Sequence, residues 1–446
     1  MFNEEERKLE KWKEEIEKTK ITENQLDLAI KQGLDRAKTK QQLKKRPYVK
    51  RGLWSAIIAA ILLLTLVTSI RVSPAFASAV ASVPGLEGIV NLIRDNKGLQ
   101  SAINNEHYEE IGVSGESSGI KISLDGAIAD ELNMVLFYTM EFKKSHKNDF
   151  IDRFELTDSD GKELKWNSIS HNYDEDFDAS MKSINSIEVQ WQDPLMVEEL
   201  LLKVHIVETN GEKEVIKIPF ITKLSDTKSE KYTLNKEVLI AEQSMVIENV
   251  TISPIQTEIQ VRFNSENTME IFGFEDLRLV DERGEVWSSI INGVTSSSRE
   301  PNIVTYFLQS NYFEEPEKLF LQFNKLMAMD KEEAYILIDT EKEEILKQPK
   351  VEHFKKVTKE NGFLSSGKDF VRIDFKGTKG YYHQPFTHYI DADGKSFDIM
   401  AGTNNNLEEP NAQIGIELEG PYKNPIKLPL SGYPSYINGD VKIQVK

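Results

Sequence analysis

Cysteine is absent from the 446-residue chain, and its absence excludes disulfide bonds, thiolate zinc sites and cysteine nucleophiles. The folded parts must therefore be stabilised by packing alone. The sequence also lacks a Gly-x-Ser-x-Gly elbow, a phosphate-binding loop, a His-Glu-x-x-His pair and a dinucleotide fingerprint. We therefore expect neither an enzyme nor a resident cofactor.

Basic residues are in the minority and unevenly distributed. The chain has 55 Lys and Arg against 73 Asp and Glu, a net charge of −18. Residues 1–51 nevertheless carry +5, from 15 basic and 10 acidic residues, so the chain from Arg71 onward carries −23. An acidic surface repels phosphate, which argues against direct binding of nucleic acid by the larger part.

Length and hydrophobic content predict several folded units. Apolar residues make up 39% of the chain and charged residues 29%, which is enough apolar material to build cores. A chain of this length is too long for one ordinary core and suggests roughly three domains.

One uncharged stretch interrupts the chain, from Leu53 to Ile70. Its 18 residues would span roughly 27 Å as a helix, close to the hydrocarbon thickness of a bilayer. Ten of them are Leu, Ile or Val, which favours insertion by about 3 to 6 kcal/mol. A buried core helix is the alternative, but such helices are usually amphipathic, whereas this stretch is apolar on every face. We therefore predict one transmembrane helix over residues 52–71.

The flanks of this stretch predict its orientation. Arg36 to Arg51 contains eight basic residues and no acidic one, whereas only Arg71 lies close on the other side. The positive-inside rule then places the N-terminus in the cytoplasm and the acidic remainder outside the cell, in a single-pass protein of the cell membrane. The nearest flanking cations are Lys44, Lys45, Arg46, Lys50, Arg51 and Arg71.

A triplet of small and aromatic residues, Ala75-Phe76-Ala77, follows the apolar stretch and matches the pattern of a cleavage site. A removed signal peptide is one interpretation. The charged leader of about fifty residues is far longer than a normal signal n-region, so we expect a retained anchor. Two interpretations of the triplet remain, a site of regulated cleavage and small residues in a juxtamembrane helix.

The cytoplasmic segment, residues 1–51, contains two amphipathic helical patterns separated by a capping box at residues 22–25. Their apolar positions are Leu9, Trp12, Ile16, Leu26, Ile30 and Leu34. So few apolar side chains cannot bury a core, and the helices therefore need a partner or each other across a dimer. The alternative is a helical tail whose apolar face touches the inner leaflet.

Beyond the membrane, residues 72–104 are predicted to form a helical stalk that Pro84-Gly85 interrupts. From about Ile111 onward apolar and polar residues alternate, which is typical of β-strands. The predicted fold class is mainly β, with short N-terminal helices, one transmembrane helix and a helical stalk ahead of tandem β-sandwich-like modules.

Three stretches of the outer region resemble one another: FELTDSDGKELKW, LRLVDERGEVW and HYIDADGKSFDI. Each leads an apolar strand into a turn with Asp and a glycine, at Gly161, Gly284 and Gly394. The glycines lie 123 and then 110 residues apart, about one β-sandwich length. We therefore predict three β modules, at residues 105–225, 230–347 and 350–446.

Two of these turns, at Asp158 and Asp391, resemble the start of a calcium loop, but neither has glutamate at the twelfth position. Turn chemistry accounts for them better. His383 and His388 would form a metal site only if they shared a face, and their spacing on a strand places them on opposite faces. We therefore expect no metal site.

The basic flank, the apolar stretch and the following RVSPAFASAVASVPGLEGIVNLIRDNKGLQSA together resemble the membrane-proximal domain of bacterial negative effectors of extracytoplasmic-function sigma factors. These are membrane-anchored anti-sigma factors, often from Firmicutes, and a large outer region without cysteine fits a Gram-positive surface. The resemblance is best up to about residue 150. The later modules look like the extracellular domains of unassigned function that accompany this family.

The resemblance implies that residues 1–45 hold a sigma factor at the membrane, that the six apolar positions named above cover its polymerase-binding face, and that an external event releases it. The segment has no cysteine or histidine, so the zinc-binding anti-sigma motif is absent. The outer modules would sense an unknown extracellular ligand or envelope stress. The alternative is a surface-anchored adhesion or cell-wall-binding protein with an inert cytoplasmic tail.

Overall fold

The chain divides into two compact units, residues 1–71 and 72–446, and every residue that the structure describes lies in the second. The structure, a computed structural model, describes residues 86–142, 150–172, 183–207, 213–223, 227–288, 295–300, 302–361, 369–379, 381, 383–399, 402–405, 407 and 409–446. None of the helices in these ranges is long and apolar enough to cross a bilayer. The predicted transmembrane segment lies outside them.

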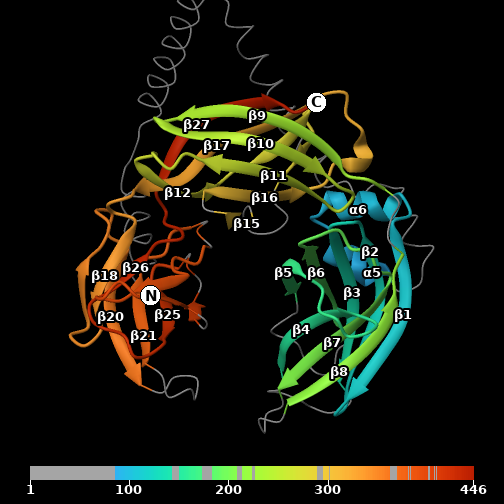
Figure 1. The fold of residues 1–446 in the computed structure, drawn as a ribbon, viewed down its shortest axis with the longest axis horizontal. Helices are drawn as coiled ribbons and strands as arrows, with labels where there is room; N and C mark the ends of the chain where they lie inside the picture. Colours follow the sequence, from blue (N-terminus) through green and yellow to red (C-terminus); the bar gives the residue numbers. More distant parts are fainter. Residues whose placement is uncertain are drawn as a thin grey trace, which may run out of the picture. The chain divides into compact units, whose positions relative to one another are not determined.

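The described part of the chain is mainly β and contains several sheets, as the alternating sequence predicts (Figure 1). The sheets pair around three separate hydrophobic cores. Strands such as β7 (Glu199–Val207) alternate strictly between buried and partly exposed residues, because successive side chains point to opposite faces of a sheet. Each sheet therefore contributes one apolar face to a sandwich.

The first sandwich joins a five-stranded and a three-stranded antiparallel sheet. The larger sheet has the order β1-β2-β3-β6-β5, formed by Tyr108–Ser117, Ile120–Ala129, Asn133–Phe142, Ser183–Trp191 and Trp166–Asn172. The smaller has the order β4-β7-β8, formed by Phe150–Asp158, Glu199–Val207 and Lys213–Ile221. Tyr138, Ile187 and Leu202 are fully buried between them.

Two short helices, α5 (Leu86–Leu92) and α6 (Lys97–Asn104), cover the other face of the larger sheet. Their apolar residues pack with residues of β2, β3 and the second sandwich: Ile89, Ile93, Leu99, Ala102, Ile103, Ile128, Val135, Phe137 and Ile255. The Asn96 side chain accepts the Leu99 N–H at 3.1 Å and begins α6. The described part of the predicted stalk is therefore packed against the first sandwich.

The second sandwich repeats this topology. Its first sheet has the order β9-β10-β11-β16-β15, formed by Glu230–Ile240, Gln243–Ile252, Gln256–Phe263, Ile303–Gln309 and Thr295–Glu300. The short helix η1 (Tyr312–Glu314) follows β16. The opposite sheet contains β12, β13, β14, β17 and β27, formed by Met269–Phe274, Arg278–Asp281, Val286–Trp287, Leu319–Asp330 and Tyr436–Gln444.

The third sandwich again pairs two antiparallel sheets. One has the order β19-β18-β26-β22-β23, formed by Glu344–Lys347, Tyr335–Asp339, Ile426–Pro429, His388–Ile390 and Ser396–Asp398. The other has the order β20-β21-β25-β24, formed by Phe354–Asn361, Asp369–Phe375, Ala412–Leu418 and Gly402–Asn405. Val371, Tyr389 and Ile414 are buried between them.

Strand pairing crosses the predicted boundary between residues 230–347 and 350–446. In the first sandwich β8 follows β7 along the chain and pairs with it. In the second sandwich β17 takes the place of β7, but its partner on that side is β27, the last strand of the chain (Figure 1). β18, which follows β17 along the chain, pairs instead with β26 in the third sandwich. The third sandwich is therefore inserted before the strand that completes the second.

Candidate functional site

The cytoplasmic, membrane-flanking and cleavage-region residues predicted from the sequence all lie outside the described residues. These are Leu9, Trp12, Ile16, Leu26, Ile30, Leu34, Lys44, Lys45, Arg46, Lys50, Arg51, Arg71, Ala75, Phe76 and Ala77. Their roles stay predictions. The described residues begin at Leu86, the first residue of α5, and show how the chain packs from there onward.

The three predicted turns share one geometry, and two of them form hairpins, β13 with β14 and β22 with β23. The first turn closes only a single bridge between Thr157 and Glu163, because β4 and β5 belong to different sheets. In every turn an Asp Oδ1 accepts two backbone N–H groups, two and four residues further along the chain, at 2.8–3.1 Å. The three residues are Asp158, Asp281 and Asp391. The glycine of each turn has φ between 82° and 85°, a conformation that glycine adopts without steric strain.

Turn chemistry therefore accounts for the aspartates that resemble calcium loops, because these carboxylate oxygens are engaged by their own backbone. His383 is partly buried, and burial lowers the pKa of its imidazole. His388 lies in β22. Across the described ranges, no group of three or more His, Asp or Glu side chains is arranged to hold a metal ion.

A buried carboxylate, Asp130, joins the first two sandwiches. It lies in the turn between β2 and β3 and accepts the N–H groups of Leu132 and Asn133 at 2.9 and 2.8 Å. Its second oxygen accepts the N–H of Ile255 at 3.3 Å, in the turn between β10 and β11. Because β2–β3 and β10–β11 hold the same places in their sheets, two equivalent turns meet at this point.

Asn133 and Gln256 extend this contact between the turns. The Asn133 amide donates to Ser253 Oγ at 3.2 Å, and Gln256 donates its own amide to Asn133 Oδ1. Asp130 is fully buried, and this burial raises the pKa of its carboxyl although the surrounding N–H groups oppose the rise. The contact is thus a desolvated polar network, in which loss of one partner leaves the others unpaired.

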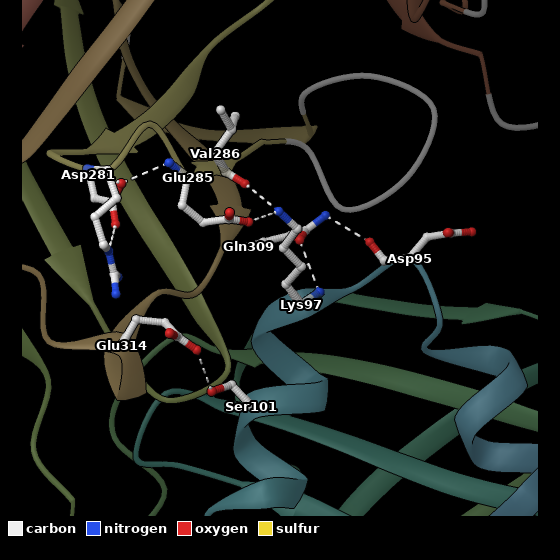
Figure 2. Close-up of polar contacts among 9 residues, drawn as sticks. Asp95, Lys97, Ser101, Asp281, Glu285, Val286, Gln309 and Glu314 are labelled. Carbon is white, nitrogen blue, oxygen red and sulfur yellow. Dashed lines mark hydrogen bonds and ion pairs between the residues drawn. The ribbon is translucent and has the colours of Figure 1, made fainter. Parts of the chain in front are cut away.

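The N-terminal end of α6 forms a second contact with the second sandwich (Figure 2). Lys97 donates its backbone N–H to Gln309 Oε1 at 3.0 Å, and Gln309 donates its amide to the carbonyl of Asp95 at 3.0 Å. The Lys97 ammonium forms an ion pair with Glu285 and donates to the Val286 carbonyl at 3.2 Å. The chain around Asp95 is therefore fixed to β16 and to the hairpin of β13 and β14.

The acid in this ion pair is particular to the second of the three turns. Glu285 lies four residues after the turn aspartate, where the other two turns have Lys162 and Lys395. Only an acid at this place can pair with Lys97. Both side chains of the pair are about half exposed, so the pair itself contributes at most about 1 kcal/mol.

The backbones of α6 and the second sandwich also approach closely at this contact. A Cβ on Gly98 would lie 2.7 Å from the backbone nitrogen of Ser310, closer than real contacts of this kind. Ser310 is buried and donates its hydroxyl to the carbonyl of Ser253. Ser101, one turn further along α6, donates to Glu314 at 3.2 Å. We call the contacts of residues 95–101 with the second sandwich the α6 clamp.

A cavity of about 320 Å³ lies beside the clamp, between strands β3, β5 and β6 of the first sandwich and β15 and β16 of the second. Leu99, Val135, Ile255 and Phe307 contribute apolar walls. This volume is at the lower end of the range of small-molecule sites.

Two acceptors of β6 line the same cavity, because Ile187, Val189 and Trp191 occupy the core face of this strand and leave its other face to Glu188 and Gln190. Glu188 has no hydrogen-bond or ion-pair partner among the described residues, and burial raises the pKa of its carboxyl. Gln190 is 6% exposed, and its Oε1 accepts no hydrogen bond in the described structure.

Sequence reasoning missed the residues of this junction. The Asp130-Glu-Leu-Asn133 stretch is a turn signal of the kind used elsewhere, but nothing in it indicates a second turn as partner. Glu188 and Gln190 alternate with apolar residues, a pattern typical of a solvent-exposed face. Only the approach of another sandwich buries them.

Two segments of the chain match known families. Residues 49–142 match a domain of unknown function (DUF4179), and residues 229–352 match a family of unknown function (DUF5643). The comparison with curated proteins gave no match. A solved structure described as the conserved domain protein from Bacillus anthracis aligns with a TM-score of 0.39 and 13% identity, over 54% of this chain and 84% of that chain. Asp130 and Ile255, which join the sandwiches, lie in the two matched segments respectively.

Proposed function

We propose that the chain is a membrane-anchored negative regulator of transcription that resembles an anti-sigma factor. In this proposal residues 1–45 hold a sigma factor in the cytoplasm, and the β-sandwiches respond to a signal outside the cell. The observation that carries the proposal is the α6 clamp. The chain that follows the predicted membrane helix does not lead to a free domain, but is built into the contact between the first two sandwiches.

The position of the clamp along the chain supports a role in coupling. Leu86, where α5 begins, is only sixteen residues beyond Ile70, the end of the predicted anchor. A change in the contact between the sandwiches would alter the packing of α5 and α6, and hence the chain nearest the membrane. The DUF4179 match supports the same unit, because it includes the predicted anchor, both helices and β1 to β3.

We further propose that the signal is transmitted by cleavage near Ala75, Phe76 and Ala77, because a single transmembrane helix transmits little by itself. Release of the α6 clamp would give a protease access to this region. The predicted result is loss of membrane tethering and release of the sigma factor.

The first experiment tests the cytoplasmic step. Full-length protein carrying an N-terminal tag is recovered from cells, and co-purified proteins are identified by mass spectrometry. We expect a sigma factor with the wild type and its loss in the Leu9→Asp/Ile16→Asp variant, whose charges break the apolar face of the helix. Glu14→Ala on the opposite, charged face is the matched control and should retain the partner. Recovery of no sigma factor with wild type would contradict the proposal.

The second experiment separates a regulator from the adhesion alternative. Deletion of residues 1–45 leaves the predicted anchor and all β-sandwiches in place. A regulator should then show increased transcription of a small set of genes. Unchanged transcription together with a surface-binding defect in cells lacking the outer sandwiches would favour an adhesion or cell-wall-binding protein instead.

A further inference from the structure

A second, more polar cavity, also of about 320 Å³, lies next to the cavity beside the α6 clamp. The two share Gln190, Ser297 and Phe307 as lining residues. Glu258 of β11 and Glu300 of β15 line the second cavity. Gln190 donates its amide to Glu258 Oε1 at 3.2 Å, which directs its own oxygen away from that carboxylate.

The charged side chains among the described lining residues of the two cavities are all acidic. Three carboxyl groups line them, those of Glu188, Glu258 and Glu300, and none of the described lining residues is Lys, Arg or His. A cavity lined by one sign of charge and by low-dielectric walls concentrates ligands of the opposite sign. Anionic ligands are therefore disfavoured.

The first cavity also has acceptors that none of the described residues satisfies. Leaving a buried acceptor unpaired costs about 1 to 3 kcal/mol, so an acceptor of this kind usually has a partner in the functional state. Gln190 Oε1 and the Glu188 carboxyl both require a donor. An ammonium group supplies up to three donors and the opposite charge, and it has no acceptor of its own.

We propose that this cavity binds a small organic amine, with an ammonium head at Glu188 and Gln190 and a short alkyl or aryl body against Leu99, Val135, Ile255 and Phe307. A volume of about 320 Å³ corresponds to roughly ten water molecules, enough for a body of six or seven carbon atoms. The inference that this amine is the extracellular signal rests on the proposed function. The inference that the cavity binds an amine does not.

Binding should depend on pH in a defined direction. Burial raises the pKa of Glu188, and it is the only titratable residue among the described residues that line the first cavity. An ammonium head requires the ionised carboxylate, so the affinity should increase as the pH rises through this pKa. Amine binding should also release a proton into the buffer.

The experiment is calorimetric titration of the full-length chain in zwitterionic nanodiscs with three probes of equal length: hexylammonium, hexanol and hexanoate. We expect hexylammonium to bind more tightly than hexanol by at least tenfold and hexanoate not to bind. Glu188→Gln should lose at least tenfold in hexylammonium affinity while its hexanol affinity is unchanged, which shows that the variant is folded. Empty nanodiscs give the blank.

The control variant is Glu237→Gln, an exposed acid of β9 outside both cavities, and it should bind as wild type does. Equal hexylammonium affinity in wild type and Glu188→Gln would overturn the proposal, since the amine would then be held by the general negative charge. Absence of hexylammonium binding at millimolar concentration would overturn it as well. Neither result depends on a sigma factor, so failure of the binding site and failure of the regulatory role are separate outcomes.

Discussion

Asp130 and Ile255 lie in two equivalent turns of successive β-sandwiches, and the carboxylate of the first accepts the backbone N–H of the second at 3.3 Å. The same carboxylate accepts two N–H groups of its own turn. One side chain therefore closes its own hairpin and also fixes the neighbouring sandwich. The α6 clamp reinforces this junction on the side of the chain that leads to the predicted membrane anchor.

Asp130→Ala should weaken the junction. Three N–H groups would lose a buried acceptor, which costs about 3 kcal/mol or more in total. We expect faster hydrogen exchange in peptides that contain residues 130–133 and 253–256, measured by mass spectrometry. Asp158→Ala is the control, because that carboxylate accepts only N–H groups of its own turn, and residues 253–256 should then exchange as in wild type. Unchanged exchange in both peptides of Asp130→Ala would show that the contact does not hold the sandwiches.

Gly98→Ala tests the α6 clamp, because a free helix and a closely packed one predict changes in stability of opposite sign. In a helix that is free of neighbours this substitution stabilises by about 1 kcal/mol. Here the added Cβ would meet the Ser310 backbone at 2.7 Å, and overpacking of this kind typically costs about 1 to 3 kcal/mol. We expect a lower thermal midpoint and faster exchange in residues 97–104.

The control for Gly98→Ala is Ser101→Ala, which removes one exposed hydrogen bond to Glu314 and should change stability by no more than about 0.5 kcal/mol. If the proposed coupling holds, Gly98→Ala also raises transcription from the regulated promoter and Ser101→Ala does not. A more stable Gly98→Ala protein would exclude close packing as the basis of the clamp.

Removal of the last strand should damage the second sandwich rather than the third. β27 pairs with β17 from Phe320 to Met327, and its Ile443 and the following Val445 are buried in the second core. Ending the chain at residue 435 would expose the edge of β17 and open that core. We expect rapid proteolysis within residues 230–330, while the core strands of residues 354–418 remain protected.

A milder variant separates strand pairing from loss of chain length. Ile443→Asp places a charge in the second core and should cost about 4 kcal/mol or more. Lys442→Ala, next to it on the outer face, removes only a cation-π contact with Phe320 and should cost about 1 kcal/mol or less. Preferential unfolding of the third sandwich in Ile443→Asp would contradict the observed strand pairing.

Glu188→Gln should stabilise the ligand-free protein at neutral pH. Burial raises the folded-state pKa of this carboxyl, so its ionisation is more costly in the folded state than in the unfolded state. The wild-type protein therefore loses stability as the pH rises from the unfolded-state pKa of Glu188 through its raised folded-state pKa. The Glu188→Gln variant has no such loss. The thermal midpoints should coincide below about pH 4 and diverge above it, with the variant higher. A constant difference at every pH would show a packing effect.

Local chemistry predicted several parts of this protein correctly. The strand alternation predicted a mainly β fold, and Asp with glycine at a fixed spacing predicted three equivalent turns, since both depend on residues that are near one another in the sequence. The prediction that all three turns are hairpins was wrong for the first, because β4 and β5 pair with distant strands in different sheets. The charge difference between the turns, Glu285 against Lys162 and Lys395, is also visible in the sequence. The ion pair that this difference allows is not visible in the sequence, because Lys97 is 188 residues away from Glu285 along the chain.

The sequence by itself determined which segments form strands and turns, because backbone conformation follows from side-chain periodicity and from turn residues. Only the tertiary structure decided which strand completes which sheet, since β17 pairs with β27 and β18 pairs with β26, and neither pairing follows the order of the strands along the chain. It also decided that Glu188 and Gln190 line a cavity and that Asp130 is buried, because burial depends on which distant segment packs against a face. The residues on which both proposals rest lie at such contacts.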